Sequence, residues 1–180
     1  MAPFNPVQMM EINDLPAERE ITEREKFFEE AHKRSIELVA RIDDMMLAVV
    51  KAQVTVEGSM IELLEAHGKD PQHYFYTSQK IKALKGIDPS EVGQPMWDIL
   101  SLCSYVRNEL VHSLNTAKIK EQSDKVREAY LAVTENERQK QGIRQMTDTQ
   151  MVTSAIYHCG SLIVIATEAK VAGNKMAKTT

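Results

Sequence analysis

Apolar residues recur at helical spacing along most of this chain, and this periodicity is the feature that most restricts its fold. Three or four apolar side chains in every two turns form a helix face that must be buried against other helices. The pattern is clear over residues 22–53, 96–114 and 148–172. No segment of useful length shows the alternation of a β-strand, and no internal repeat is present. The sequence therefore predicts an all-α helical bundle of about five or six helices.

Local signals indicate where these helices begin and end. Thr22-Glu23-Arg24-Glu25 has the form of a capping box, so a long helix is predicted to begin there and to run to about Gln53. A second helix is expected from about Val54 to His67 and is ended by Gly68. The other predicted helices are a short one capped by Thr77 or Ser78, one from about Met96 to Leu114, a charged one from Lys118 to about Gln139, and a last one capped by Asp148 and running to about Ala172.

The length and composition are typical of one globular domain. The chain has 180 residues, of which 43% are hydrophobic and 27% charged. Residues 1–20, which include three prolines, are expected to form an irregular N-terminal arm. Residues 21–172 are predicted to be a single helical domain, and residues 173–180 a flexible tail.

Charge, cysteine usage and hydropathy restrict the ligands and the cellular location that can be expected. A net charge of −4 excludes a protein coated in positive potential, so a nucleic-acid ligand would need a local basic patch. Cys103 and Cys159 fall within apolar helical patterns and are expected to be buried free thiols. The first residues do not show a basic start followed by an apolar core, so secretion is not expected. The longest apolar run, residues 162–166, is too short to span a membrane. We therefore expect a cytoplasmic protein without membrane contact.

The predicted helix over residues 96–114 contains the main candidate functional residues. At about 100° per residue, one face is apolar and is expected to be buried; it consists of Ile99, Cys103, Val106, Leu110 and Leu114. The opposite face carries Ser101, Ser104, Asn108 and His112. Small neutral polar groups, in place of the Lys and Glu of a solvated face, are typical of a surface that another chain or a ligand approaches.

Several residues nearby have both a functional and a structural interpretation. Arg107 can lie along the core and pair with Glu109 or with an acid on a neighbouring helix, and His112 can stabilise the helix C-terminus. Lys80, Lys82 and Lys85 are candidates for binding RNA, but they also suit a solvated face. Tyr74-Phe75-Tyr76 is more typical of core and turn packing than of a platform for base stacking. No histidine or cysteine spacing suits a metal, and neither a metal nor another cofactor is predicted.

The segment Arg107-Asn108-Glu109-Leu110-Val111-His112 resembles the Arg-x(4–6)-His signature of the HEPN superfamily. Residues 78–84 (SQKIKAL), followed after a loop by residues 105–112 (YVRNELVH), are similar to the mannitol-operon repressor family within it. The resemblance covers roughly residues 60–115 and depends mainly on the hexapeptide. In those relatives the residue before the histidine is commonly small, whereas here it is Val111.

This resemblance implies a helical bundle that dimerises through the motif helices, so that two Arg–His pairs line one cleft. Many members of the superfamily are metal-independent ribonucleases of toxin–antitoxin, phage-defence or CRISPR-linked systems. Others have the fold without shown catalysis, including the repressor-like group. The resemblance thus implies either a homodimeric ribonuclease, with RNA and a protein antitoxin as partners, or a non-catalytic helical module of transcriptional regulation with a regulatory partner.

The residues suit the first of these functions. An imidazole can accept and donate protons, so His112 can transfer protons to and from ribose oxygens. Arg107 can hold a phosphate, with Asn108 in support. On an ideal helix Arg107 and His112 diverge by about 140°. We therefore do not expect one chain to direct both groups at one phosphate, and the ribonuclease hypothesis requires a dimer.

Overall fold

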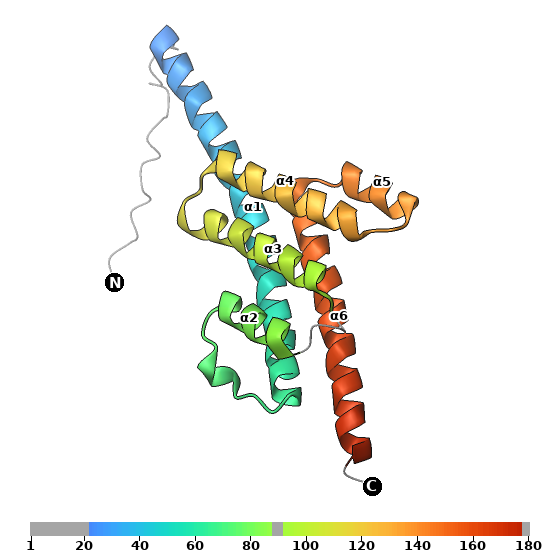
Figure 1. The fold of residues 1–180 in the computed structure, drawn as a ribbon. Helices are drawn as coiled ribbons and strands as arrows, with labels where there is room; N and C mark the ends of the chain where they lie inside the picture. The colour runs from blue at the N-terminus through green and yellow to red at the C-terminus, as the bar shows by residue number, and fades with distance from the viewer. Residues whose placement is uncertain (1–21, 88–91, 178–180) are drawn as a thin grey trace, which may run out of the picture. The chain divides into compact units, whose positions relative to one another are not determined.

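The computed structural model describes residues 22–87 and 92–177. These residues form helices and no strand, which confirms the predicted all-α class (Figure 1). The chain divides after Val39 into two compact units, and helix α1 (Glu23–Ala66) contributes to both. The single domain predicted over residues 21–172 thus includes a boundary within α1. The predicted arm over residues 1–20 lies outside the described residues.

In the first unit, α1 begins with the predicted capping box. The Thr22 backbone N–H donates to Glu25 Oε2 at 2.8 Å, and the Glu25 N–H donates to Thr22 Oγ1 at 3.3 Å. Three apolar residues of the predicted stripe are exposed here: Phe28 by 58%, Ile36 by 56% and Val39 by 54%. The periodicity in this part of α1 correctly indicates a helix, but the described residues do not bury its apolar face.

The second unit contains the rest of α1 and the remaining helices. These are the 3-10 turn η1 (Pro71–His73), α2 (Thr77–Ile87), α3 (Gln94–His112), α4 (Thr116–Val133), α5 (Glu137–Gln145) and α6 (Asp148–Ala177). Helix α3 is central, because it packs against α2, α4 and α6 (Figure 1). Helix α5 packs against α4.

The core contains the side chains that helical periodicity predicts. Trp97 and four residues of the predicted stripe on α3 are at most 1% exposed: Ile99, Cys103, Val106 and Leu110. The fifth, Leu114, lies beyond the end of α3 and is 53% exposed, so its predicted burial is wrong. On α6 the apolar residues at helical spacing form the inward face, buried at Val152, Ala155, Ile156, Cys159, Ile163 and Ala166 and partly buried at Leu162.

Two helix boundaries differ from the prediction. Helix α1 continues through Gln53 without a break, because no glycine or proline interrupts it there. The charged helix predicted from Lys118 to Gln139 is instead two helices, α4 and α5. Asn136 starts α5 by accepting the Gln139 N–H at 3.1 Å, which ends the continuity with α4.

Helix α6 also begins and ends differently. Its cap is Thr147, whose Oγ1 accepts the Gln150 N–H at 3.2 Å, and Asp148 is the first helical residue. The helix runs to Ala177, so the described part of the predicted tail, residues 173–177, is helical. Asp148–Asn174 is the one described segment long and apolar enough to cross a membrane, although 44% of its most apolar window is buried inside the protein. A core helix of a bundle passes the same test.

Candidate nucleic-acid interface

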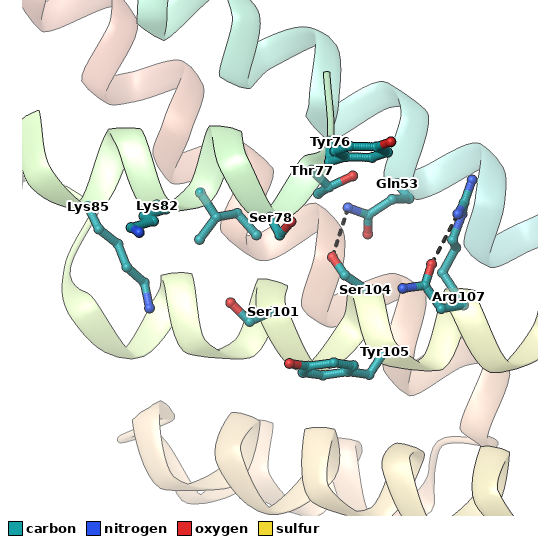
Figure 2. A pocket seen from close by; sticks show the side chains of 12 residues that line it. Gln53, Tyr76, Thr77, Ser78, Lys82, Lys85, Ser101, Ser104, Tyr105 and Arg107 are labelled. Carbon is teal, nitrogen blue, oxygen red and sulfur yellow. Dashed lines mark hydrogen bonds between the residues drawn. The ribbon is translucent and has the colours of Figure 1, made fainter. Parts of the chain in front are cut away.

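Helices α1, α2 and α3 line a pocket of about 510 Å³ (Figure 2). Its lining comprises Gln53 of α1, Tyr76 just before α2, Thr77, Ser78, Ile81, Lys82 and Lys85 of α2, and Ser101, Ser104, Tyr105, Arg107 and Asn108 of α3. Every charged side chain in this lining is basic. The pocket is therefore a local basic surface on a chain whose net charge is −4.

Two residues of the predicted motif, Arg107 and Asn108, line this pocket. Arg107 is partly buried, and its Nη1 donates to Asn108 Oδ1 at 3.1 Å. Glu109, the partner expected if Arg107 were purely structural, accepts a hydrogen bond from the Ser113 hydroxyl. In the described part of the chain no carboxylate pairs with Arg107, so its positive charge remains available to a ligand.

His112, the third residue of the motif, lies elsewhere. It is the last residue of α3, is exposed, and is not part of the pocket lining. Arg107 lies five residues earlier, which corresponds to a divergence of about 140° around the helix. A single chain therefore does not bring Arg107 and His112 together.

The three predicted lysines have different surroundings. Lys82 is exposed and lines the pocket. Lys85 also lines the pocket, but its Nζ lies 2.7 Å from Asp98 Oδ1, and this carboxylate partly neutralises its positive charge. Lys80 is buried, and its Nζ lies 3.5 Å from Glu57 Oε2. Lys80 therefore takes no part in the basic surface.

Glu57 of α1 holds the beginning of α2. It accepts a hydrogen bond from the Thr77 hydroxyl and pairs with Lys80, whose Nζ also lies 3.5 Å from the Phe75 carbonyl oxygen. These contacts attach the first turn of α2 and the preceding residues to α1. They fix the part of α2 from which Ser78 and Lys82 reach the pocket.

Two exposed aromatic rings belong to the pocket lining. Tyr76 is 70% exposed and Tyr105 is 60% exposed. In the segment Tyr74-Phe75-Tyr76 only Tyr74 packs against the core, and Phe75 is 81% exposed. The packing interpretation of this segment therefore describes Tyr74, whereas the other two rings are free to contact a ligand.

The buried amide of Gln53 was not among the predicted site residues. Gln53 is 2% exposed, and its Nε2 donates to Ser104 Oγ at 3.3 Å across the pocket wall. Its position was detectable in the sequence, because it shares a helix face with Val49, Val56 and Met60. Helical spacing alone is therefore enough to identify a single amide side chain on an otherwise apolar helix face.

Other reactive side chains lie outside this pocket. Cys103 and Cys159 are buried free thiols, as predicted. His158 is exposed and packs on Tyr130, with 5.6 Å between ring centroids, so it does not activate its neighbour Cys159. Among the residues that the structure describes, no group of three or more His, Cys, Asp or Glu side chains could hold a metal ion.

No protein-family model matches the chain, and no similar curated protein or solved structure was found. The assignment of a site therefore depends on the residues and their geometry. The likeness to the HEPN superfamily remains an expectation based on Arg107, Asn108 and His112.

Proposed function

We propose that this protein is a metal-independent ribonuclease of the HEPN kind, active as a homodimer in the cytoplasm. The observation that carries the proposal is that Arg107 and Asn108 line a pocket whose charged lining residues are all basic. Lys82 and Lys85 add positive charge from α2, which favours a polyanionic ligand. A role in a toxin–antitoxin or phage-defence system, with a protein antitoxin as partner, belongs to the same proposal.

The proposed reaction is a transesterification within the RNA strand. The ribose 2′-oxygen attacks the adjacent phosphorus, and the bond from phosphorus to the 5′-oxygen of the next nucleotide breaks. His112 takes the proton from the 2′-hydroxyl and returns one to the leaving 5′-oxygen. Arg107 holds the phosphate oxygens and stabilises their developing charge, while Asn108 helps to orient the phosphate. The products are a 2′,3′-cyclic phosphate and a 5′-hydroxyl end.

The proposed site needs two chains. A twofold axis that pairs the α3 helices would set Arg107 of one protomer beside His112 of its partner. Exposed apolar side chains near the C-terminal end of α3 offer surface for such pairing; they are Tyr105 (60%), Val111 (39%) and Leu114 (53%).

The same exposed side chains favour a second function. In it, the protein is a non-catalytic helical regulator or interaction module of the mannitol-repressor-like kind, and the α3 surface binds a regulatory partner. Arg107 and His112 would then contribute to association and not to catalysis. The two functions differ in whether RNA is cleaved.

Replacing His112 or Arg107 with alanine tests the ribonuclease function. We expect each change to lower the cleavage of end-labelled RNA by at least about 100-fold, because proton transfer or charge stabilisation is lost. The assay contains EDTA, and circular dichroism checks the fold. His32→Ala is the matched control, because His32 is an exposed helical histidine of the first unit.

The outcomes separate the two functions. Equal cleavage by wild type and His112→Ala would overturn the assignment of His112. If neither the wild type nor the variants cleave RNA, and Arg107→Ala and His112→Ala lose self-association in light scattering, the interaction module is supported instead.

A further inference from the structure

Gln53 carries a hydrogen-bonding atom that the fold leaves unused. The residue lines the pocket and is 2% exposed, and its Oε1 has no hydrogen-bond partner among the described residues. Buried polar atoms without a partner are rare in native proteins and require an explanation. A ligand in the pocket is one source of the missing donor.

The neighbouring serine determines which end of the amide is free. Ser104 Oγ donates its single proton to the Leu100 carbonyl oxygen at 2.9 Å. Toward Gln53 this hydroxyl can therefore only accept, and it receives the Nε2–H at 3.3 Å. The opposite amide orientation would place two acceptors against each other. The free atom is consequently an acceptor, and it matches an N–H donor of a ligand.

The surroundings of Gln53 indicate the chemical class of that ligand. The pocket volume of about 510 Å³ is suited to a small planar molecule or part of a chain. Figure 2 shows Gln53 and Ser104 between Lys82 at one end and Arg107 at the other. A group with a ring that stacks on tyrosine, an N–H at its edge and an attached phosphate satisfies all these features. A nucleotide has this combination.

We propose that Gln53 recognises a nucleobase by accepting an N–H from the base edge. The proposal deepens the proposed function and rests on it in one respect: the phosphates of the bound strand are held by Lys82 and Arg107. In the free structure Oε1 is covered, so the base reaches it only after a side chain at the rim moves. Tyr76, which is 70% exposed and lines the same pocket, is available to stack on the base.

Two nucleotides that differ by one amino group test this inference. Adenine has a single type of N–H donor at its edge, the exocyclic amine, and purine riboside lacks it. Isothermal titration of the full chain with adenosine 5′-monophosphate and purine riboside 5′-monophosphate is the measurement. We expect purine riboside monophosphate to bind at least about tenfold more weakly, because it leaves Oε1 unpaired.

Two variants assign the discrimination to Gln53. Gln53→Met has similar volume but no amide, and it should bind the two nucleotides with equal affinity. Ser104→Ala removes the hydroxyl that fixes the amide orientation, so the discrimination should fall to a few-fold. If Gln53→Met fails to fold, equal affinities in the wild type still overturn the proposal, and Ser104→Ala still tests whether the Gln53 amide is responsible.

Each outcome has a definite meaning. Equal affinities in the wild type, or no binding of adenosine monophosphate at millimolar concentration, overturn the assignment of Gln53. If the wild type discriminates between the two nucleotides but cleaves no RNA, nucleobase recognition is supported and the ribonuclease proposal is contradicted. If the wild type cleaves RNA but binds the two nucleotides equally, the ribonuclease proposal is supported and the proposed role of Gln53 is contradicted.

Discussion

Lys80 and Lys82 illustrate at the residue scale how neighbouring positions of one helix acquire different roles. Two positions on a helix differ by about 200°, so one side chain faces α1 while the other faces the pocket. Lys80 pairs with Glu57 and is buried, whereas Lys82 is exposed. Of the three lysines, only Lys82 and Lys85 add to the positive charge of the pocket, and the charge of Lys85 is partly neutralised by Asp98.

The buried thiols predict a loss of stability at alkaline pH. Burial raises the pKa of Cys159 to about 12 and, together with the nearby Cys159, raises the pKa of Cys103. In the unfolded chain the pKa of a thiol is about 8.5. The stability gained by keeping the thiols neutral is therefore fully present below that pH. It declines as the pH rises toward the folded pKa, by about 1.4 kcal/mol per thiol and pH unit.

Urea unfolding at pH 7.5 and pH 10 measures this effect. Tyrosines and lysines also begin to titrate in this range, so Cys159→Ala provides the comparison. The wild type should lose more free energy of unfolding between the two pH values than the variant does. An equal loss in both proteins would show that ionisation of Cys159 does not contribute.

At the element scale, α1 and α6 approach closely at Gly160. A Cβ at this position would lie 2.6 Å from Val56 Cγ2, and a β-branched valine has little freedom to move away. We expect Gly160→Ala to lower the free energy of unfolding by about 1–3 kcal/mol, because the two helices must separate. Thermal unfolding followed by circular dichroism is the measurement.

Gly58 of α1 provides the matched control. A Cβ there meets no atom within 4 Å, and the residue is exposed. Gly58→Ala should therefore stabilise the protein by up to about 1 kcal/mol through helix propensity. If Gly160→Ala proved as stable as Gly58→Ala, the close approach of α1 and α6 would be contradicted.

Helices were predictable where a single stripe of apolar residues continues, and less so at their ends. The burial of Trp97, Cys103 and Leu110 on α3 depends on helical phase, which the order of residues contains. The break between α4 and α5 depends on Asn136, a weak signal without a neighbouring glycine or proline. Side-chain caps of this kind compete closely with helix continuation, so the local sequence alone does not decide them.

At the scale of the whole molecule, the proposed catalytic pair requires a second copy of the chain. Arg107→Ala and His112→Ala proteins should each be inactive alone. If Arg107 of one protomer acts with His112 of its partner, a heterodimer of the two variants retains one intact site. An equimolar mixture after subunit exchange should then recover about a quarter of the wild-type cleavage rate, because half of the dimers are mixed and each has one of two sites.

The recovery of activity distinguishes sites that are shared between protomers from sites within one chain. Size-exclusion chromatography with light scattering confirms that both variants still dimerise. A mixture with no more activity than the separate variants, although heterodimers form, would exclude a site shared in this way.

The sequence alone determined that this chain is helical and that α3 carries Arg107, Asn108 and His112, because helical period and motif spacing depend only on residue order. The tertiary structure decided which of these residues line the pocket. Gln53 and Ser104 are 51 positions apart, and their hydrogen bond forms only when α1 packs beside α3. The burial of Lys80, the free acceptor of Gln53 and the separation of His112 from Arg107 likewise depend on how the helices pack and where each one ends.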